Sequence, residues 1–328
     1  MSVFRKDPAR AAAPAASAPA MAVANPMRGI MLKVVSVLFF VIMATMLKAT
    51  ETVPSGEMVF FRSFFALIPV LGYLAWKRRF YQAFATKRPL GHILRGLVGV
   101  TSMSLGFFAL TRLPLPEATA INYATPLLIV IFSAVLLHER VHVFRWTAVM
   151  VGLVGVVIIL WPRLTVFSGG EALGDAEAVG AIAALLAAVV SAFAQMAVRN
   201  LVHTERTEAI VTYFFISASV LSLMTLPFGW VWPTPQQAAL LVGAGFFGGL
   251  GQLLMTSSYR YADMSVIAPF EYVSLLLTIV IGFFVFAEVP TVTMVVGALI
   301  IIGSGIAVIL REHRLGLDRI KAKEATTP

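Results

Sequence analysis

The stretch LPLPEATAINYATPLLIVIFSAVLLHERV, at residues 113–141, has a divergent second copy, YADMSVIAPFEYVSLLLTIVIGFFVFAEVP, at residues 261–290. Shifts of 149 or 151 residues align further positions of the two halves in the same order: Asn122-Tyr123 with Glu271-Tyr272, Thr125 with Ser274, Glu139 with Glu288, Gly99 with Gly248, Gly29 with Gly180, Lys48 with Arg199 and Glu57 with Glu208. Because the order and the offset are nearly constant, these matches predict an internal duplication.

The chain around these copies is too apolar for a soluble protein. Of its 328 residues, 59% are hydrophobic and 12% are charged, whereas soluble domains have about 45–50% apolar and about 25% charged residues. The mean hydropathy is +0.89. This composition excludes a water-soluble enzyme, a disordered chain and a nucleic-acid-binding protein, despite the basic pI. The sequence has no cysteine, which excludes disulfides and thiol-based sites.

Ten apolar segments are close to the length of about 20 residues that a helix needs to cross the hydrocarbon core. The uncharged run from Ala209 to Tyr259 counts as two of them, because residues 227–235 contain three prolines and two tryptophans suited to the membrane interface. The predicted spans are 29–48, 57–76, 91–111, 116–137, 143–161, 178–198, 208–229, 237–258, 264–286 and 291–310. The predicted fold is therefore an all-α integral membrane protein with ten transmembrane helices.

The basic residues predict how these helices are oriented. With the N-terminus in the cytoplasm, the outer loops hold only Lys48, Arg112 and Arg163, and most of the 25 basic residues lie on the cytoplasmic side. This asymmetry is the positive-inside rule. Both termini are then cytoplasmic, in a membrane of the bacterial inner-membrane type, and contact with anionic membrane lipid is a secondary possibility.

Four regions follow from this topology. Residues 1–27 are rich in alanine and proline and predict a disordered cytoplasmic tail, and the charged stretch 311–328 predicts a similar basic tail. The two five-helix repeats would occupy 28–162 and 175–310. Since five is odd, the second repeat enters the membrane from the opposite side. Inverted repeats of this kind are characteristic of secondary transporters, with the substrate site at the repeat interface near mid-membrane.

The two quoted stretches resemble the EamA-type repeat of the drug/metabolite transporter superfamily. The first is followed by the glycines of VGLVG (151–155) and the second by Gly297 and Gly303, although Leu275 stands where the first copy has Pro126. MRGIMLKVV (27–35), Lys48 and RGLVG (95–99) resemble the subgroup of S-adenosylmethionine-type and riboflavin-type importers. The resemblance covers about residues 28–310 and implies a small-molecule carrier with no cofactor.

Glu271 is the most informative of the ionisable residues within the spans, where each charge costs about 2.5–3.5 kcal/mol. It lies in PFEYVS, two residues after Pro269. We expect a carboxylate that binds a proton or cation; the alternative is an ion pair with Arg62 or Arg95. Together with Tyr272, Asn122 and Tyr123 it forms a predicted substrate site at the repeat interface. Each tyrosine could instead make a hydrogen bond between helices.

The remaining polar residues of the spans have two interpretations each. Arg62 could pair with Glu57 or capture a substrate carboxylate or phosphate, and Arg95 is expected to extend to the cytoplasmic face. Further candidates are Lys48 and Lys33, expected at the interface, and Gln195 and Gln252, expected to line a cavity or join helices. Gly245 and Gly249 form a G-x-x-x-G pattern typical of close helix packing.

One motif points to a different class of protein. His138-Glu139-Arg140-Val141-His142 fits H-E-x-x-H, in which two histidines hold zinc and the glutamate acts as a base. The repeat already explains the glutamate, because Glu288 matches it without neighbouring histidines, and no third ligand follows. An intramembrane zinc hydrolase and a non-transporting scaffold therefore remain only as alternatives, and no metal site is predicted.

The sequence thus predicts a secondary carrier that moves a small metabolite by alternating access, driven by protons or by exchange. An exporter of amino acids or drugs with the same fold is the main alternative. Aromatic, amide and carboxylate groups suit an amphipathic substrate such as an amino acid, a nucleoside-like compound or a flavin.

Overall fold

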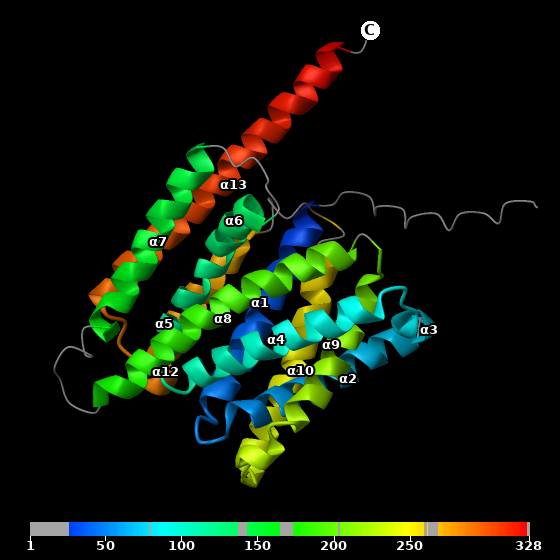
Figure 1. Cartoon of the computed structure of the whole chain (residues 1–328), viewed down its shortest axis with the longest axis vertical. Helices are drawn as coiled ribbons and strands as arrows, with labels where there is room; N and C mark the ends of the chain where they lie inside the picture. Colours follow the sequence, from blue (N-terminus) through cyan, green and yellow to red (C-terminus); the bar gives the residue numbers. More distant parts are fainter. Residues whose placement is uncertain are drawn as a thin grey trace, which may run out of the picture.

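The computed structural model describes residues 26–78, 80–136, 143–164, 173–202, 204–258, 261 and 268–326. Within these ranges the chain is almost entirely helical and contains no strand, as Figure 1 shows. The helices are α1 (Pro26–Lys48), α2 (Ser55–Trp76), α3 (Phe80–Phe84), α4 (Pro89–Leu110), α5 (Leu115–Asn122), α6 (Ala124–Leu136), α7 (Val143–Leu164), α8 (Leu173–Val202), α9 (Thr207–Leu223), α10 (Pro235–Ser258), α12 (Val273–Phe286) and α13 (Val292–Thr326), with 3-10 segments η2 (Leu226–Phe228) and η3 (Ala268–Tyr272).

The apolar helices match the ten expected spans. Six are long enough to cross a membrane: Met27–Lys48, Ser55–Trp76, Pro89–Leu110, Leu115–Leu136, Ala176–Val198 and Pro235–Ser258. Four shorter apolar helices are Trp146–Pro162, Glu208–Leu223, Phe270–Phe286 and Val292–Val308. The predicted all-α membrane fold is confirmed.

Some predicted boundaries were wrong. The span expected at 208–229 ends at Leu223. The residues that follow form η2, which contains Pro227 and is terminated by Gly229 with a left-handed φ of 97°. The stretch after Leu310, expected as a disordered tail, continues α13 as helix to Thr326. The tail at 1–25 lies outside the described residues.

The helix contacts repeat between the two halves. Helices at the same position in each half pack on each other: α2 on α9, α5 on α12, and α7 on α13. The first helix of each half packs on the third apolar helix of the other, so α1 lies along α10 and α8 lies along α4 (Figure 1). These reciprocal pairs are the contacts expected of two inverted five-helix copies.

Glycines bring several of these helices into close contact. At Gly249 of α10, an added Cβ would lie 2.6 Å from Pro69 Cγ and 2.7 Å from the Ala66 carbonyl oxygen of α2, and Gly245 is as tightly placed. An added Cβ at Gly155 of α7 would lie 2.7 Å from the carbonyl oxygen of Gly297 in α13. The predicted packing role of the G-x-x-x-G pattern is confirmed.

Candidate functional site

Both repeats interrupt their fourth apolar helix at a tyrosine. In the first half, α5 ends at Asn122 and α6 begins at Ala124. Pro126 explains the interruption, because it has no N–H to offer the Asn122 carbonyl and its ring crowds that oxygen. In the second half, η3 ends at Tyr272 directly before α12. Tyr123 and Tyr272, which the repeat aligns, therefore stand at equivalent helix breaks.

Three residues of the predicted quartet meet at these breaks. The Tyr123 hydroxyl donates to the Glu271 carbonyl oxygen (3.0 Å) and shares a hydrogen bond with the Ser274 hydroxyl. The rings of Tyr123 and Tyr272 pack edge to face, with centroids 5.1 Å apart. The fourth residue, Asn122, is exposed, and its side-chain oxygen accepts a long hydrogen bond (3.5 Å) from the Thr125 hydroxyl.

The partner of the Glu271 carboxylate is Lys33 of α1, with which it forms an ion pair. The alternative of an ion pair with Arg62 or Arg95 was therefore wrong about the partner. Protein covers Lys33, whose side chain is only 3% exposed, whereas the side chain of Glu271 is 43% exposed. In the sequence both residues lie about one to two turns into spans that begin at the same face, but Arg95 shares this position, so the pattern does not by itself select Lys33. We call Lys33, Tyr123, Glu271, Tyr272 and Ser274 the tyrosine–carboxylate cluster.

A second ion pair ties the other end of α1 to the second half. Lys48 Nζ lies 3.4 Å from Glu288 and donates to the Leu113 carbonyl oxygen at 2.7 Å. Glu288 also accepts a hydrogen bond from the Leu115 N–H (2.8 Å). Lys48 is therefore buried rather than simply interfacial. By helix geometry it lies about 22 Å along α1 from Lys33.

The two arginines lie apart from the cluster, between α2, α4 and α9. Arg62 does not pair with Glu57, whose carboxylate instead accepts from the Val231 N–H (3.1 Å). Arg95 does not extend to the membrane face as expected, because its Nε and Nη1 are buried and its guanidinium lies 4.1 Å from the Phe214 ring centroid. The aromatic ring holds the side chain inside the bundle.

The other predicted candidates are not brought to the cluster. Gln195 of α8 is exposed and Gln252 of α10 is half-buried. The motif at 138–142, with Glu139, lies outside the described residues. In the part of the chain that the structure describes, no group of three His, Asp or Glu residues could hold a metal ion.

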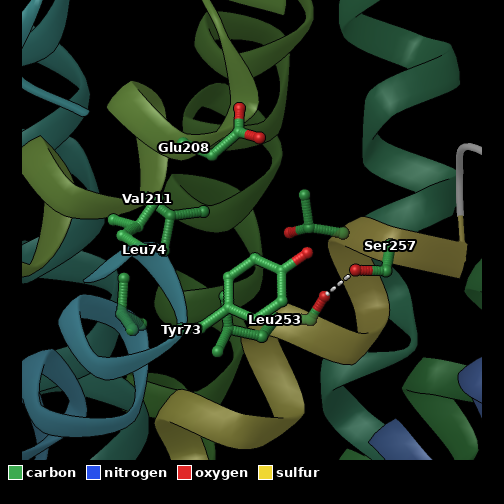
Figure 2. A pocket seen from close by; sticks show the side chains of 8 residues that line it. Tyr73, Leu74, Glu208, Val211, Leu253 and Ser257 are labelled. Carbon is green, nitrogen blue, oxygen red and sulfur yellow. Dashed lines mark hydrogen bonds between the residues drawn. The ribbon is translucent and has the colours of Figure 1, made fainter. Parts of the chain in front are cut away.

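A shallow depression lies between α2, α9 and α10, near the beginning of α9 and the end of α10. Figure 2 shows the Tyr73 ring projecting into it, with Glu208 on one side and Ser257 on the other. The Ser257 hydroxyl donates to the Leu253 carbonyl oxygen (2.7 Å). Its lining contains no residue of the tyrosine–carboxylate cluster.

Glu205, in the loop between α8 and α9, joins this loop to the loop between α3 and α4. Its carboxylate accepts from the N–H groups of Lys87 (2.7 Å) and Arg88 (3.0 Å) and from the Thr86 hydroxyl (3.0 Å). Burial alone would raise the pKa of Glu205, but these hydrogen bonds and the charge of His92 outweigh it and hold the pKa below its usual value.

A model of the EamA-like transporter family matches residues 27–161 and again residues 178–311. The chain belongs to this family. It is 29% identical to the S-adenosylmethionine uptake transporter of Rickettsia prowazekii over 263 residues, covering 79% of this chain and 84% of the relative. It is 28% identical to the pseudopaline exporter CntI of Pseudomonas aeruginosa, covering 85% and 95%. It is 29% identical to the riboflavin transporter of Vibrio cholerae, covering 76% and 80%.

A solved crystal structure shares the fold of this EamA-like chain, with a TM-score of 0.62 and 20% identity over 87% of this chain and 99% of the other. The membership places the chain in the drug/metabolite transporter superfamily and confirms the predicted resemblance. Because the relatives named above are transporters of small molecules, they support a membrane transporter and give no support to a zinc hydrolase.

Proposed function

We propose that the protein is a secondary carrier that moves a small organic metabolite across the bacterial inner membrane by alternating access. Residues 28–162 and 175–310 are its two repeats, and both termini lie in the cytoplasm. The observation that carries the proposal is the tyrosine–carboxylate cluster, in which helix breaks from both repeats meet. Discontinuous helices at repeat-related positions are where such carriers bind their substrates.

Glu271 is the coupling residue in this proposal. Its carboxylate is partly exposed, while Lys33 behind it is buried and supplies one positive charge. A proton or a cationic substrate group that reaches Glu271 competes with Lys33 for the carboxylate. Such competition would link binding to the contact between α1 and η3, and hence to the contact between the repeats.

The test is uptake and counterflow in proteoliposomes with labelled S-adenosylmethionine, riboflavin and aromatic amino acids, with and without a pH gradient. Wild type is compared with Glu271→Gln and with the control Glu51→Gln, which changes an exposed glutamate in the loop after α1. Gradient-driven uptake by wild type and the control, with exchange alone in Glu271→Gln, supports coupling through Glu271. Equal exchange by all three without any effect of pH would make Glu271 structural. Failure to move any solute would contradict the carrier.

Export is a second candidate, because one of the relatives is named as an exporter. The same carrier cycle runs in either direction according to the gradients. Inside-out vesicles from cells that produce the protein distinguish the two: accumulation driven by an inward-acid gradient supports export by proton exchange, whereas accumulation only in right-side-out vesicles supports import.

A further inference from the structure

Two arginines from neighbouring helices, the buried Arg62 and the half-buried Arg95, lie in the same aromatic environment. The Arg62 guanidinium of α2 lies 5.1 Å from the ring centroid of Phe215, and the Arg95 guanidinium of α4 lies 4.1 Å from that of Phe214. The two rings belong to consecutive residues of α9. We call Arg62 and Arg95 the arginine pair.

The charge of the arginine pair is not balanced. Within the described ranges, no carboxylate lies at ion-pair distance from either guanidinium. Arg62 is 6% exposed, and its Nη1 contacts the Met103 sulfur at 3.4 Å, which is a weak acceptor. The Nε of Arg62 and the Nε and Nη1 of Arg95 are buried with no acceptor among the described residues. Buried charges normally have a counter-charge, so this arrangement needs an anion.

Two glycines lie next to the arginine pair. Gly99 and Gly248 occupy equivalent positions, and each borders one guanidinium. A Cβ at Gly99 would overlap Arg95 Nη1, and a Cβ at Gly248 would lie 3.4 Å from Arg62 Nε. The absence of a side chain at Gly99 therefore leaves room for the Arg95 guanidinium, whereas at Gly248 the overlap would be with Met43 Sδ, at 2.7 Å.

From this geometry we propose that the arginine pair binds the oxyanion of the transported substrate, a carboxylate or a phosphate monoester on an aromatic or apolar body. The inference rests on the proposed carrier function and adds a substrate class to it. Guanidinium groups bind both oxyanions through paired hydrogen bonds, and the phenylalanine rings and the Met103 thioether suit the apolar part. Because the unsatisfied nitrogens are covered in this conformation, the anion reaches them as the helices separate during the transport cycle.

The test measures ligand-induced thermal stabilisation of the purified protein in detergent. The probes are phenylacetate, phenyl phosphate and the neutral phenylacetamide, used with wild type, Arg62→Gln, Arg95→Gln and the control Arg112→Gln. Arg112 also stacks on a ring, with its guanidinium 4.1 Å from the Phe108 centroid, but lies outside the pair. We expect at least one of the two anions to stabilise wild type and Arg112→Gln, with at least tenfold weaker binding in Arg62→Gln and Arg95→Gln.

The choice of probe distinguishes the two oxyanions, since preference for phenylacetate assigns a carboxylate and preference for phenyl phosphate a phosphate. Equal effects of the anions and the amide, or anion binding unchanged in both arginine variants, would overturn the site. If a glutamine variant does not fold, Arg62→Lys and Arg95→Lys keep the charge and lose the paired donors; unchanged anion binding in both would also overturn it.

Transport assays distinguish failure of the proposed arginine site from failure of the proposed carrier function. Uptake of neutral riboflavin by wild type and by both glutamine variants, without stabilisation by either anion, would overturn the arginine site and leave the carrier standing. Anion binding that needs both arginines, with no flux of any compound, would support the site and contradict the carrier.

Discussion

Replacing Glu271 by glutamine should destabilise the protein more than replacing its partner Lys33 by methionine. The two side chains differ sharply in exposure, at 43% for Glu271 and 3% for Lys33. In Glu271→Gln, a buried ammonium loses this counter-charge, and removal of one partner of a buried pair costs about 3–5 kcal/mol. Because the glutamine oxygen can still accept a hydrogen bond, we expect about 2–3 kcal/mol.

The reverse change leaves a carboxylate that solvent can reach. In Lys33→Met, Glu271 is hydrated on its exposed side and an apolar side chain fills the buried position, so the cost should resemble that of an exposed pair, about 1 kcal/mol or less. The double variant removes both charges and should be close to Lys33→Met alone. The difference between the single variants, about 2 kcal/mol, corresponds to about a 30-fold change in the unfolding equilibrium.

The assay is equilibrium unfolding by SDS in mixed micelles, followed by the fluorescence of the five tryptophans. Both singles and the double variant are compared with wild type at the same detergent ratio. A Lys33→Met variant that is as unstable as Glu271→Gln, or a double variant less stable than either single, would refute the assignment of the buried charge to Lys33.

Three further predictions concern other parts of the bundle. Gly249→Ala should destabilise the protein by about 1–3 kcal/mol, because the added Cβ forces α10 away from α2. The control Gly72→Ala should not change stability, because its Cβ would meet nothing within 4 Å. Thermal unfolding compares the two variants, and equal losses of stability would contradict the packing argument. The Glu205 carboxylate should stabilise the protein at pH values above 4.5, the ordinary pKa of a glutamate. This stabilisation should be lost as the pH falls through the lowered pKa of Glu205 in the folded protein. The difference in melting temperature between wild type and Glu205→Gln should therefore shrink on acidification, and a constant difference would count against it. Tyr123→Phe removes the hydrogen bonds of the Tyr123 hydroxyl and should lower the free energy of unfolding by about 1 kcal/mol, measured by the same SDS unfolding. An unchanged stability would mean that these hydrogen bonds do not stabilise the protein.

The membrane fold could be predicted from the sequence because its two determinants are local. Runs of apolar residues locate the spans, and the spacing of Gly245 and Gly249 locates a close helix contact without knowledge of the partner. The end of the seventh span at Leu223 was missed, because the residues up to Gly229 are as apolar as the helix before them and only their backbone conformation departs from it.

The site could be predicted only where the repeat itself indicated it. The alignment of Tyr123 with Tyr272 located a pair of residues that do meet. The partner of Glu271 could not be predicted, because Lys33, Arg62 and Arg95 all lie within spans and the choice depends on how each helix is rotated and which helices adjoin. For the same reason, the sequence did not show that both arginines face α9.

The first helix of each half packs on a helix of the other half, and this arrangement has a consequence for biogenesis. Lys33 enters the membrane 238 residues before its partner Glu271 is made. At ordinary synthesis rates of about 5–20 residues per second, this interval is roughly 10–50 s. For most of that time α10 has not yet been made, and α1 has no η3 beside it until the end, so the Lys33 ammonium waits in the membrane without its carboxylate. Assembly of the first half is therefore completed only when the second half has been inserted.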